Sequence, residues 1–390
     1  MAVINRIAEF DAEMRAWRRH LHSIPELDFD LYQTAAFVVA RLREMGVDEI
    51  HEGIARTGIV ALIRGQGEGP VVGLRADMDA LPIEERPERP YKSRHAGRMH
   101  ACGHDGHVTI LLGAARYLAE TRNFAGTVAL IFQPSEEMSG GGKVMCDEGM
   151  MERFGISRVW ALHNMPGLPL GNVGTRPGPL MAATDQFEIV VRGRGGHAAY
   201  PHNCLDPVPP AIDIAQGLRS IVSRRVDPLV SAVVSLTVLE AGEATNIIPQ
   251  SARLAGTVRT LDAMTRQAIA GWIRTLAESG ARAHGATAEV SYEFGYPVVV
   301  NDPVEAAFCA RVAAEVVGEA RVVADCAPQM GAEDFAYMLE ARPGAYVFLG
   351  TGDGAPLHHP DFDYNDDASP IGASYFARLV ETALPRRAPS

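Results

Sequence analysis

The segment GTVALIFQPSEE, residues 126–137, decides the fold class, because an apolar run in it ends at two adjacent carboxylates. A short apolar run bounded by turn residues is typical of a strand that is buried on both faces. Pro134 and Ser135 supply the turn, and Glu136 and Glu137 follow it. The segment therefore predicts a buried strand with acidic side chains at its carboxyl end.

Three further apolar runs lead to acidic or histidine side chains: PVVGLRADMD (70–79) to Asp77 and Asp79, RVWALHN (158–164) to His163, and AYVFLGTGDGAPLHHP (345–360) to His358 and His359. Helical spacing of apolar residues occurs between and before these runs, at residues 6–21, 34–45, 108–120 and 143–151. Strands that alternate with helices predict an α/β domain with a mostly parallel sheet and helices on both faces. Such sheets bind ligands at the carboxyl ends of their strands, so we expect these side chains to converge at one edge.

Residues 184–296 show a different order of elements. Strands are expected at 185–195, 229–240, 251–260 and 287–296, with helices at 206–223 and 265–285. This β-α-β-β-α-β order is the split pattern of a ferredoxin-like α+β domain, and no acidic pair ends its strands. We therefore expect an inserted domain at 184–296 that interrupts a catalytic domain made of residues 1–183 and 297–390.

The segment MHACGHDGHV, residues 99–108, concentrates one cysteine and three histidines in ten positions. Cys102 and His104 are too close for a zinc-finger pair, but an irregular loop before a helix can direct both inward. A packed cysteine beside surface histidines is the simpler interpretation of such a pair alone. Together with Glu136, Glu137 and His163, the pattern favours a metal site. The set suits zinc, manganese, nickel or cobalt, and the thiolate disfavours magnesium and calcium.

The paired carboxylates suggest a division of labour. One of Glu136 and Glu137 would bind the metal while the other takes a proton from metal-bound water, as in metal-assisted hydrolysis. Asp77 and Asp79 would suit a phosphatase-like nucleophile pair only with a hydroxyl residue two positions further on, where this chain has Leu81. A turn or capping aspartate is the plainer alternative, and we favour Asp79 as the residue that orients a ligand histidine.

Composition excludes several function classes. A chain of 390 residues exceeds the usual size of one core, so two domains are expected. A net charge of −12 without a Lys/Arg-rich run argues against a nucleic-acid partner. No stretch approaches the ~20 apolar residues that span a bilayer, and the first residues do not resemble a signal peptide. Five scattered cysteines do not form a disulfide framework, which predicts a cytoplasmic, reduced protein.

These motifs, taken together, resemble the aminoacylase/glutamate-carboxypeptidase metallopeptidase family. The closest match is its amidohydrolase branch, which includes hippurate hydrolases, auxin-conjugate hydrolases and N-acetyldiaminopimelate deacetylases. The resemblance covers nearly the whole chain through ordered motifs: RRHLHSIPEL (18–27), GLRADMDALPI (73–83), MHACGHDGH (99–107), FQPSEE (132–137), LHN (162–164), GRGGHAAYPH (193–202), TNIIP (245–249), GTVRT (256–260), MGAEDFA (330–336) and LHHPDFDYND (357–366).

The resemblance implies a two-metal catalytic domain interrupted by a lid domain that also forms a homodimer. The implied ligands of two divalent metal ions are Cys102, at the bridging position, His104, Glu137, His163 and His358. His358 is preferred to His359 because the family motif has its histidine directly after the leucine. Departures at Asp30-Leu31 and in MSGGGKVMC (138–146) touch no proposed ligand.

The resemblance also implies roles for other side chains. Glu136 would be the general base, and Asp79 would support a metal ligand. His197 of the lid would polarise the scissile carbonyl, while Asn246 and Arg259 would grip the substrate carboxylate.

The expected activity is metal-dependent hydrolysis of the amide bond of an N-acyl amino acid. A dipeptidase or carboxypeptidase of the same family is the nearest alternative, differing in what the acyl pocket accepts. A non-catalytic metal-binding interaction protein and a cysteine hydrolase that uses Cys102 with a histidine are alternatives of other classes.

Overall fold

The computed structural model describes residues 3–386, which form two compact units. Unit 1 comprises residues 3–180, 300–327 and 334–386, and unit 2 comprises Met181–Val299 and Pro328–Glu333. Two short strands, β7 (Gly178–Met181) and β14 (Val299–Asn301), pair where the chain passes between the units. Among the described residues, no helix has both the length and the apolar character needed to cross a bilayer. The domain boundaries expected from the sequence stay a prediction.

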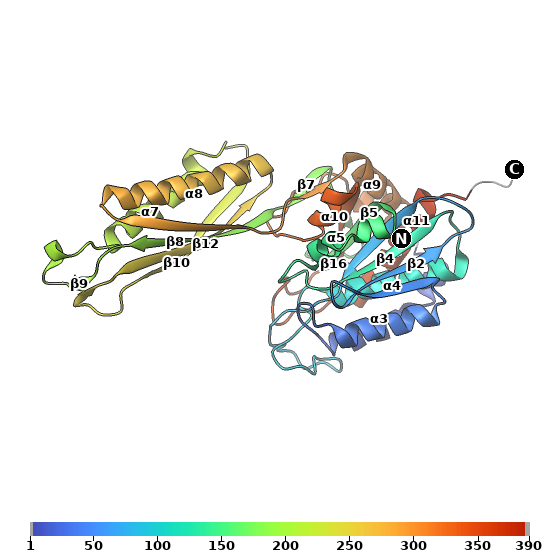
Figure 1. The fold of residues 1–390 in the computed structure, drawn as a ribbon. Coiled ribbons are helices and arrows are strands. Elements are labelled where there is room, and N and C mark those ends of the chain that lie inside the picture. Colours follow the sequence, from blue (N-terminus) through green and yellow to red (C-terminus); the bar gives the residue numbers. More distant parts are fainter. Residues whose placement is uncertain (1–2, 387–390) are drawn as a thin grey trace. The chain divides into compact units, whose positions relative to one another are not determined.

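Unit 1 is built on an eight-stranded sheet (Figure 1). Its strands, in spatial order, are β1 (Glu49–Ile54), β2 (Gly58–Arg64), β4 (Thr127–Gln133), β3 (Val71–Asp77), β5 (Ile156–Pro166), β16 (Gly344–Gly352), β6 (Val173–Gly174) and β15 (Val322–Val323). The four central strands, β4, β3, β5 and β16, run parallel, while β1, β2 and β4 pair antiparallel. This confirms the predicted α/β fold with a mostly parallel centre.

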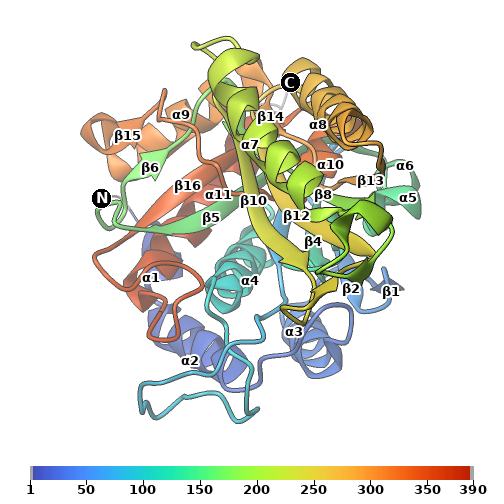
Figure 2. The same cartoon turned by 90° about the vertical axis from the view of Figure 1, so that its left-hand side faces the viewer.

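Helix α4 (His104–Thr121) is the central helix of unit 1, and most of its residues are buried. It packs against β3 and against α2 (Asp11–His22), α3 (Tyr32–Glu44) and α11 (Ser369–Ala383), the last of which also contacts α9 (Pro303–Val317) (Figure 2). A second group consists of short helices: α5 (Gly141–Asp147) packs against β4, α6 (Met150–Arg153) packs against β5, and α10 (Ala336–Ala341) packs against α5. The apolar residues of α4 and its neighbours form one continuous core.

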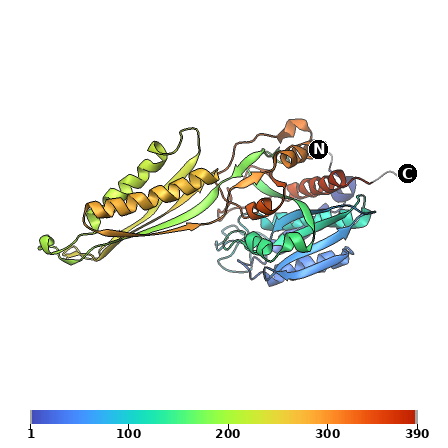
Figure 3. The same cartoon turned by 45° about the horizontal axis from the view of Figure 1, so that its top comes forward.

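Unit 2 has the β-α-β-β-α-β order predicted for residues 184–296. Its elements are β8 (Ala183–Arg192), α7 (Val208–Arg224), β10 (Ala232–Ala241), β12 (Ser251–Thr260), α8 (Ala263–Ala283) and β13 (Thr287–Phe294). The antiparallel sheet has the order β10-β12-β8-β13, and α7 and α8 cover one of its faces (Figure 3). Burial alternates along β8 and β12, as expected for strands with one face on a core.

Three predicted helices differ from the observed ones. The helix expected over 6–21 is divided into α1 (Asn5–Ala8) and α2, because the N–H of Phe10 bonds the Ile7 carbonyl three residues back. The helix expected over 143–151 is divided into α5 and α6 at Gly149, whose φ of +78° ends a right-handed turn. The helix expected to begin at residue 108 begins at His104 instead.

Candidate metal centre

The carboxyl ends of the central strands bring the predicted polar side chains together within unit 1. Asp77 is the last residue of β3, His163 lies in β5, and Glu136 and Glu137 follow β4 after a two-residue turn. His104 is the first residue of α4, and Cys102 lies in the loop before it. All of these side chains are buried or nearly so, and that of Glu137 is 8% exposed.

A tight backbone contact orients this loop. Gly103, between Cys102 and His104, has a φ of +90°, a conformation that favours glycine. A Cβ at this position would lie 2.3 Å from the side-chain oxygen of Asn164. Glycine therefore lets the loop approach β5 closely, so that Cys102 and His104 both face the strand ends.

Two groups of potential metal-ligand atoms share the sulphur of Cys102. The ligand atoms of Cys102, His104 and His163 lie within 4.8 Å of one another, and the same holds for those of Cys102, Glu137 and His358. A further group of the same dimensions joins His104 to both Glu136 and Glu137. Thiolate, imidazole and carboxylate donors are the groups that soft or borderline divalent ions prefer, so these residues fit such ions.

Both histidines of the first group turn the same ring nitrogen toward the centre. The Nδ1 of His163 donates a hydrogen bond to the Asn164 carbonyl oxygen at 2.7 Å. The Nδ1 of His104 lies 2.9 Å from the carbonyl oxygen of Asp79 and 3.3 Å from its Oδ1. Since these oxygens are acceptors, each Nδ1 carries a hydrogen, and Nε2 is the ring nitrogen that each histidine can offer to a metal ion. Among the described residues, the buried Nε2 of His104 has no hydrogen-bond partner, so a metal ion that displaces its proton could bind this nitrogen.

His107 was not among the predicted site residues, although it lies beside them. Its Nδ1 is 2.5 Å from Oδ1 of Asp77, and its Nε2 accepts a hydrogen bond from the backbone N–H of Asn164 at 3.0 Å. Because both ring nitrogens are engaged, His107 joins β3 to β5 rather than offering a ligand atom. The sequence signal that could have identified His107 is its spacing of three residues from His104, which places both side chains on one face of a helix.

A buried arginine lies beneath the centre. The guanidinium of Arg75 donates to Gln133 at 2.8 Å, to Asp77 at 2.6 Å and to Asp334 at 3.1 Å. Asp334 also accepts a hydrogen bond from the backbone N–H of Gly142 at 2.7 Å. These bonds tie β3, β4 and the start of α5 together below the side chains that face the site.

The electrostatics of the site favour a cation. Burial raises the pKa of the Cys102 thiol well above its usual range, and the carboxylates of Glu137 and Glu136 add to this. Burial lowers the pKa of His104, but nearby carboxylates, chiefly those of Asp77 and Asp79, raise it to about 10. A divalent ion would supply the positive charge that these acidic groups attract and would allow the thiol to ionise.

His358 joins the centre from the loop after β16. Its Nε2 lies 3.3 Å from Oε1 of Glu137, and its side chain is 52% exposed. The backbone N–H of His358 donates to the carbonyl of Ala101 at 2.8 Å, which holds it beside the Cys102 loop. His359 instead accepts a hydrogen bond from the backbone of Asp361 at 3.2 Å. His358 thus contacts Glu137 while His359 contacts Asp361, and the choice of His358 as the ligand stays a prediction.

The structure does not bring the three residues predicted from the inserted domain together within unit 2. His197 lies in β9 (Gly196–His197), which pairs with β11 (Ile247–Ile248), and the carbonyl of Asn246 accepts a bond from Ala198 at 3.0 Å. Arg259 pairs with Thr184 at the end of the sheet where β8 begins. Figure 1 shows β9 at the opposite end of the unit. Along β12, residues 251–259 alone span roughly 26 Å.

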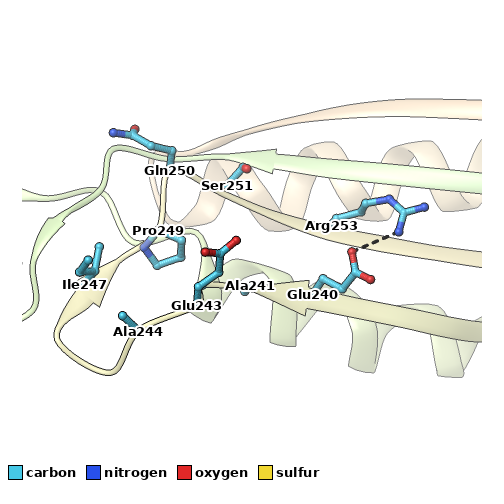
Figure 4. Close-up of a pocket in the computed structure, with 10 residues that line it drawn as sticks. Glu240, Ala241, Glu243, Ala244, Ile247, Pro249, Gln250, Ser251 and Arg253 are labelled. Atoms are coloured by element: carbon cyan, nitrogen blue, oxygen red, sulfur yellow. Dashed lines mark hydrogen bonds and ion pairs between the residues drawn. The ribbon is translucent and has the colours of Figure 1, made fainter.

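A surface hollow lies beside the β9–β11 pair in unit 2. It has a volume of about 660 Å³, and Figure 4 shows Ile247, Pro249 and Gln250 at one side of it. Glu240 and Arg253 form an ion pair of 3.2 Å across β10 and β12. The hollow is lined by Glu240, Ala241, Gly242, Glu243, Ala244, Ile247, Pro249, Gln250, Ser251 and Arg253.

Comparisons with known proteins agree with this geometry. An N-acetylcysteine deacetylase of Bacillus subtilis is 40% identical over 376 residues, which cover 96% of this chain and 98% of the relative. A hippurate hydrolase of Campylobacter jejuni is 40% identical over 380 residues, covering 97% and 99%. The crystal structure of a dinuclear metal-binding M20 peptidase from Bacillus subtilis superposes with a TM-score of 0.86 at 36% identity, covering 97% and 99%. Residues 73–382 match peptidase family M20/M25/M40, and the chain belongs to this family.

Proposed function

We propose that this protein is a metal-dependent amidohydrolase that cleaves the amide bond of N-acyl amino acids to give a carboxylic acid and an amino acid. The observation that carries the proposal is the position of Glu136. It is buried next to Glu137 and within 4.8 Å of His104, beside the two ligand groups that share Cys102. The two relatives, an N-acetylcysteine deacetylase and a hippurate hydrolase, support this substrate class by their names.

We assign five side chains to two divalent ions: Cys102, His104, Glu137, His163 and His358. Zinc, manganese, nickel or cobalt would suit this set. Divalent ions, when bound by these side chains, would supply Lewis-acid chemistry, which lowers the pKa of water and polarises a carbonyl.

The chain's own residues carry the proton and the developing charge. Glu136 takes a proton from the attacking water and passes it to the leaving nitrogen. The Nδ1 of His197 accepts a hydrogen bond from the N–H of Ala199 at 3.1 Å, so its Nε2 carries the hydrogen. That N–H can donate to the carbonyl oxygen as negative charge develops on it. Asn246 and Arg259 are assigned to the substrate carboxylate.

The opposite positions of His197 and Arg259 support a homodimer as the working form. One small substrate cannot reach both ends of the unit 2 sheet, so the two residues would contact it from different subunits. Strand β10 forms an edge of that sheet and offers a backbone for pairing with a second copy. All five cysteines lie within residues 3–386 and form no disulfide there, which supports the cytoplasm as the location.

A cysteine hydrolase is the weaker candidate. A cysteine nucleophile needs a lowered thiol pKa, whereas burial and two carboxylates raise that of Cys102. Burial also lowers the pKa of the adjacent His163 to about 3, which makes it a poor base. A purely metal-binding role would not require a proton acceptor at the position of Glu136.

A substrate panel tests the proposal. N-acetyl, N-benzoyl and indole-acetyl amino acids, together with dipeptides, are offered to protein loaded separately with zinc, manganese, nickel or cobalt. We expect amide hydrolysis of the N-acyl amino acids, and a loss on the order of 10²–10⁴-fold in Glu136→Gln protein that keeps its metal. Hydrolysis of dipeptides alone would favour the peptidase alternative. Near-normal turnover by metal-loaded Glu136→Gln would overturn the assigned mechanism.

A further inference from the structure

Two residues in left-handed backbone conformations are bonded to each other beside the metal centre. Asp28 has a φ of +57° and Ser135 a φ of +53°, and neither is glycine. A side chain makes this conformation costly, more so for serine than for aspartate. The hydroxyl of Ser135 donates to Oδ1 of Asp28 at 2.5 Å. Strained positions that the surrounding structure maintains point to a functional requirement.

Ser135 organises the turn that carries both glutamates. It is fully buried between the end of β4 and Glu136. Its hydroxyl accepts a hydrogen bond from the N–H of Ser139 at 3.0 Å, and its carbonyl accepts one from the N–H of Gly141 at 2.8 Å. Since a carboxylate can only accept, the hydroxyl hydrogen goes to Asp28. The bond to Asp28 therefore fixes the orientation of the group that closes the turn.

The loop that carries Asp28 is itself held at several points. Leu27 forms a bridge with Ala80, and the N–H of Ala80 donates to the Glu26 carbonyl at 2.8 Å. Ala80 directly follows Asp79. From the side of β2, the Thr57 hydroxyl donates to the Phe29 carbonyl at 2.8 Å. The loop thus connects the segment after β3 to the turn after β4. The side chain of Asp28 contacts this turn through Ser135.

We propose that Asp28 is a positioning residue for Glu136, acting through Ser135. Its carboxylate holds the hydroxyl of Ser135, and so the left-handed turn, in the conformation that directs Glu136 toward the reacting atoms. This inference rests on the proposed role of Glu136 as general base. Glu137 is held independently, because its N–H donates to Oδ2 of Asp79 at 3.0 Å. Loss of the Asp28 bond should therefore affect proton transfer more than metal binding.

Glycine variants separate the hydrogen bond from backbone strain. Glycine adopts a positive φ without cost, so Asp28→Gly and Ser135→Gly each remove the bond and leave no strained residue at that position. For both we expect kcat to fall about 10- to 100-fold, the cost of a misplaced catalytic group. KM and the zinc affinity of the apoprotein should stay within about threefold of wild type, because neither depends on the placement of Glu136. The kcat of the double variant should be no lower than that of the less active single variant, because the two substitutions remove the same hydrogen bond.

Matched variants complete the experiment. Asp28→Asn keeps an acceptor oxygen and tolerates the left-handed region, so it should restore most of kcat. Asp30→Gly is the control, because Asp30 lies on the same loop but is exposed and pairs with Arg56 at 2.5 Å. It should leave kcat unchanged.

The outcomes distinguish this inference from the proposed function. Wild-type kcat in a folded Asp28→Gly or Ser135→Gly protein overturns the positioning role, as does a parallel loss of kcat and zinc affinity. If Glu136→Gln itself keeps full turnover, the proposed function fails whatever the Asp28 variants show.

Discussion

The carboxyl group of Asp79 connects two proposed metal ligands that come from different elements. Its Oδ1 lies 3.3 Å from Nδ1 of His104 on α4, and its Oδ2 accepts a hydrogen bond from the N–H of Glu137 after β4 at 3.0 Å. The backbone carbonyl of Asp79 accepts from the same His104 nitrogen at 2.9 Å. Asp79, a single residue in the segment after β3, therefore fixes both the ring of His104 and the backbone of Glu137.

Asp79→Ala should weaken metal binding. Loss of a group that orients a metal ligand typically costs about 10- to 100-fold in affinity or activity. We expect a loss of metal affinity in the lower part of that range, because the backbone carbonyl of residue 79 still accepts a hydrogen bond from His104. Competition with a chromophoric chelator measures the affinity. Asp185→Ala is the matched control, since Asp185 is equally buried but lies in unit 2. Equal affinities of Asp79→Ala and wild type would contradict the orienting role.

Cys102 should be protected from alkylation by bound metal. If its sulphur is a ligand, metal and reagent compete for the same lone pair. We expect the apoprotein to be alkylated at Cys102 much faster than the metal-loaded form, as followed by mass spectrometry. Chelation should also abolish activity reversibly. Cys204 in unit 2 is the internal control and should react at the same rate in both forms. Equal rates at Cys102 would refute its role as a ligand.

The buried His22 should make stability depend on alkaline pH. Its Nδ1 lies 2.8 Å from Asp105 and its Nε2 3.3 Å from Glu85. Burial lowers the pKa of His22, but these two carboxylates raise it to about 9, above its ordinary value of 6.5. The stabilisation by the charged ring is thus complete below about pH 6.5 and lost as pH rises through about 9.

Thermal unfolding of wild type and His22→Gln tests this dependence. The difference between their midpoints should be large at pH 6 and should shrink by pH 10, because glutamine carries no charge at either pH. His284→Gln is the control, since His284 forms a surface pair with Asp213 at 2.7 Å. Surface ion pairs contribute little to stability, so the unfolding midpoint of His284→Gln should stay close to that of wild type from pH 6 to pH 10. A constant difference for His22→Gln across the range would show that the ring stabilises the fold by packing alone.

Local sequence patterns predicted those parts of the site that follow from strand ends. The run ending at Glu136 and Glu137 and the strand at 251–260 needed only apolar periodicity and turn residues, and the structure has both strands. The placement of His104 at the first turn of α4 was missed, because the helix there begins with a glycine-flanked, polar segment. A hydrophobic pattern does not mark such a start.

Contacts between residues distant in the chain were out of reach of these patterns. In the sequence Asp77 is one of a pair of aspartates, yet in the structure its carboxylate bonds the ring of His107, thirty positions away. It also bonds the nearby Arg75. The bond between Asp28 and Ser135 spans 107 positions. Neither pairing has a local signature, since the first depends on how α4 packs against β3 and the second on how the loop before α3 lies against the turn after β4.

Mixed dimers should recover activity that neither parent variant has. His197 and Arg259 lie at opposite ends of the unit 2 sheet, so we expect His197 to serve the site of the other subunit. His197→Ala removes one donor to the oxyanion and should lower kcat about 10²- to 10³-fold while leaving the fold intact.

The experiment co-assembles Glu136→Gln subunits with His197→Ala subunits. In each heterodimer one site then combines an intact Glu136 with an intact His197 from the other chain. With random assembly, half of the dimers are mixed and each has one complete site, so about one quarter of wild-type activity should return. Differently tagged subunits allow the mixed dimers to be purified. If these dimers form and stay as inactive as either parent, His197 does not act across the subunit boundary.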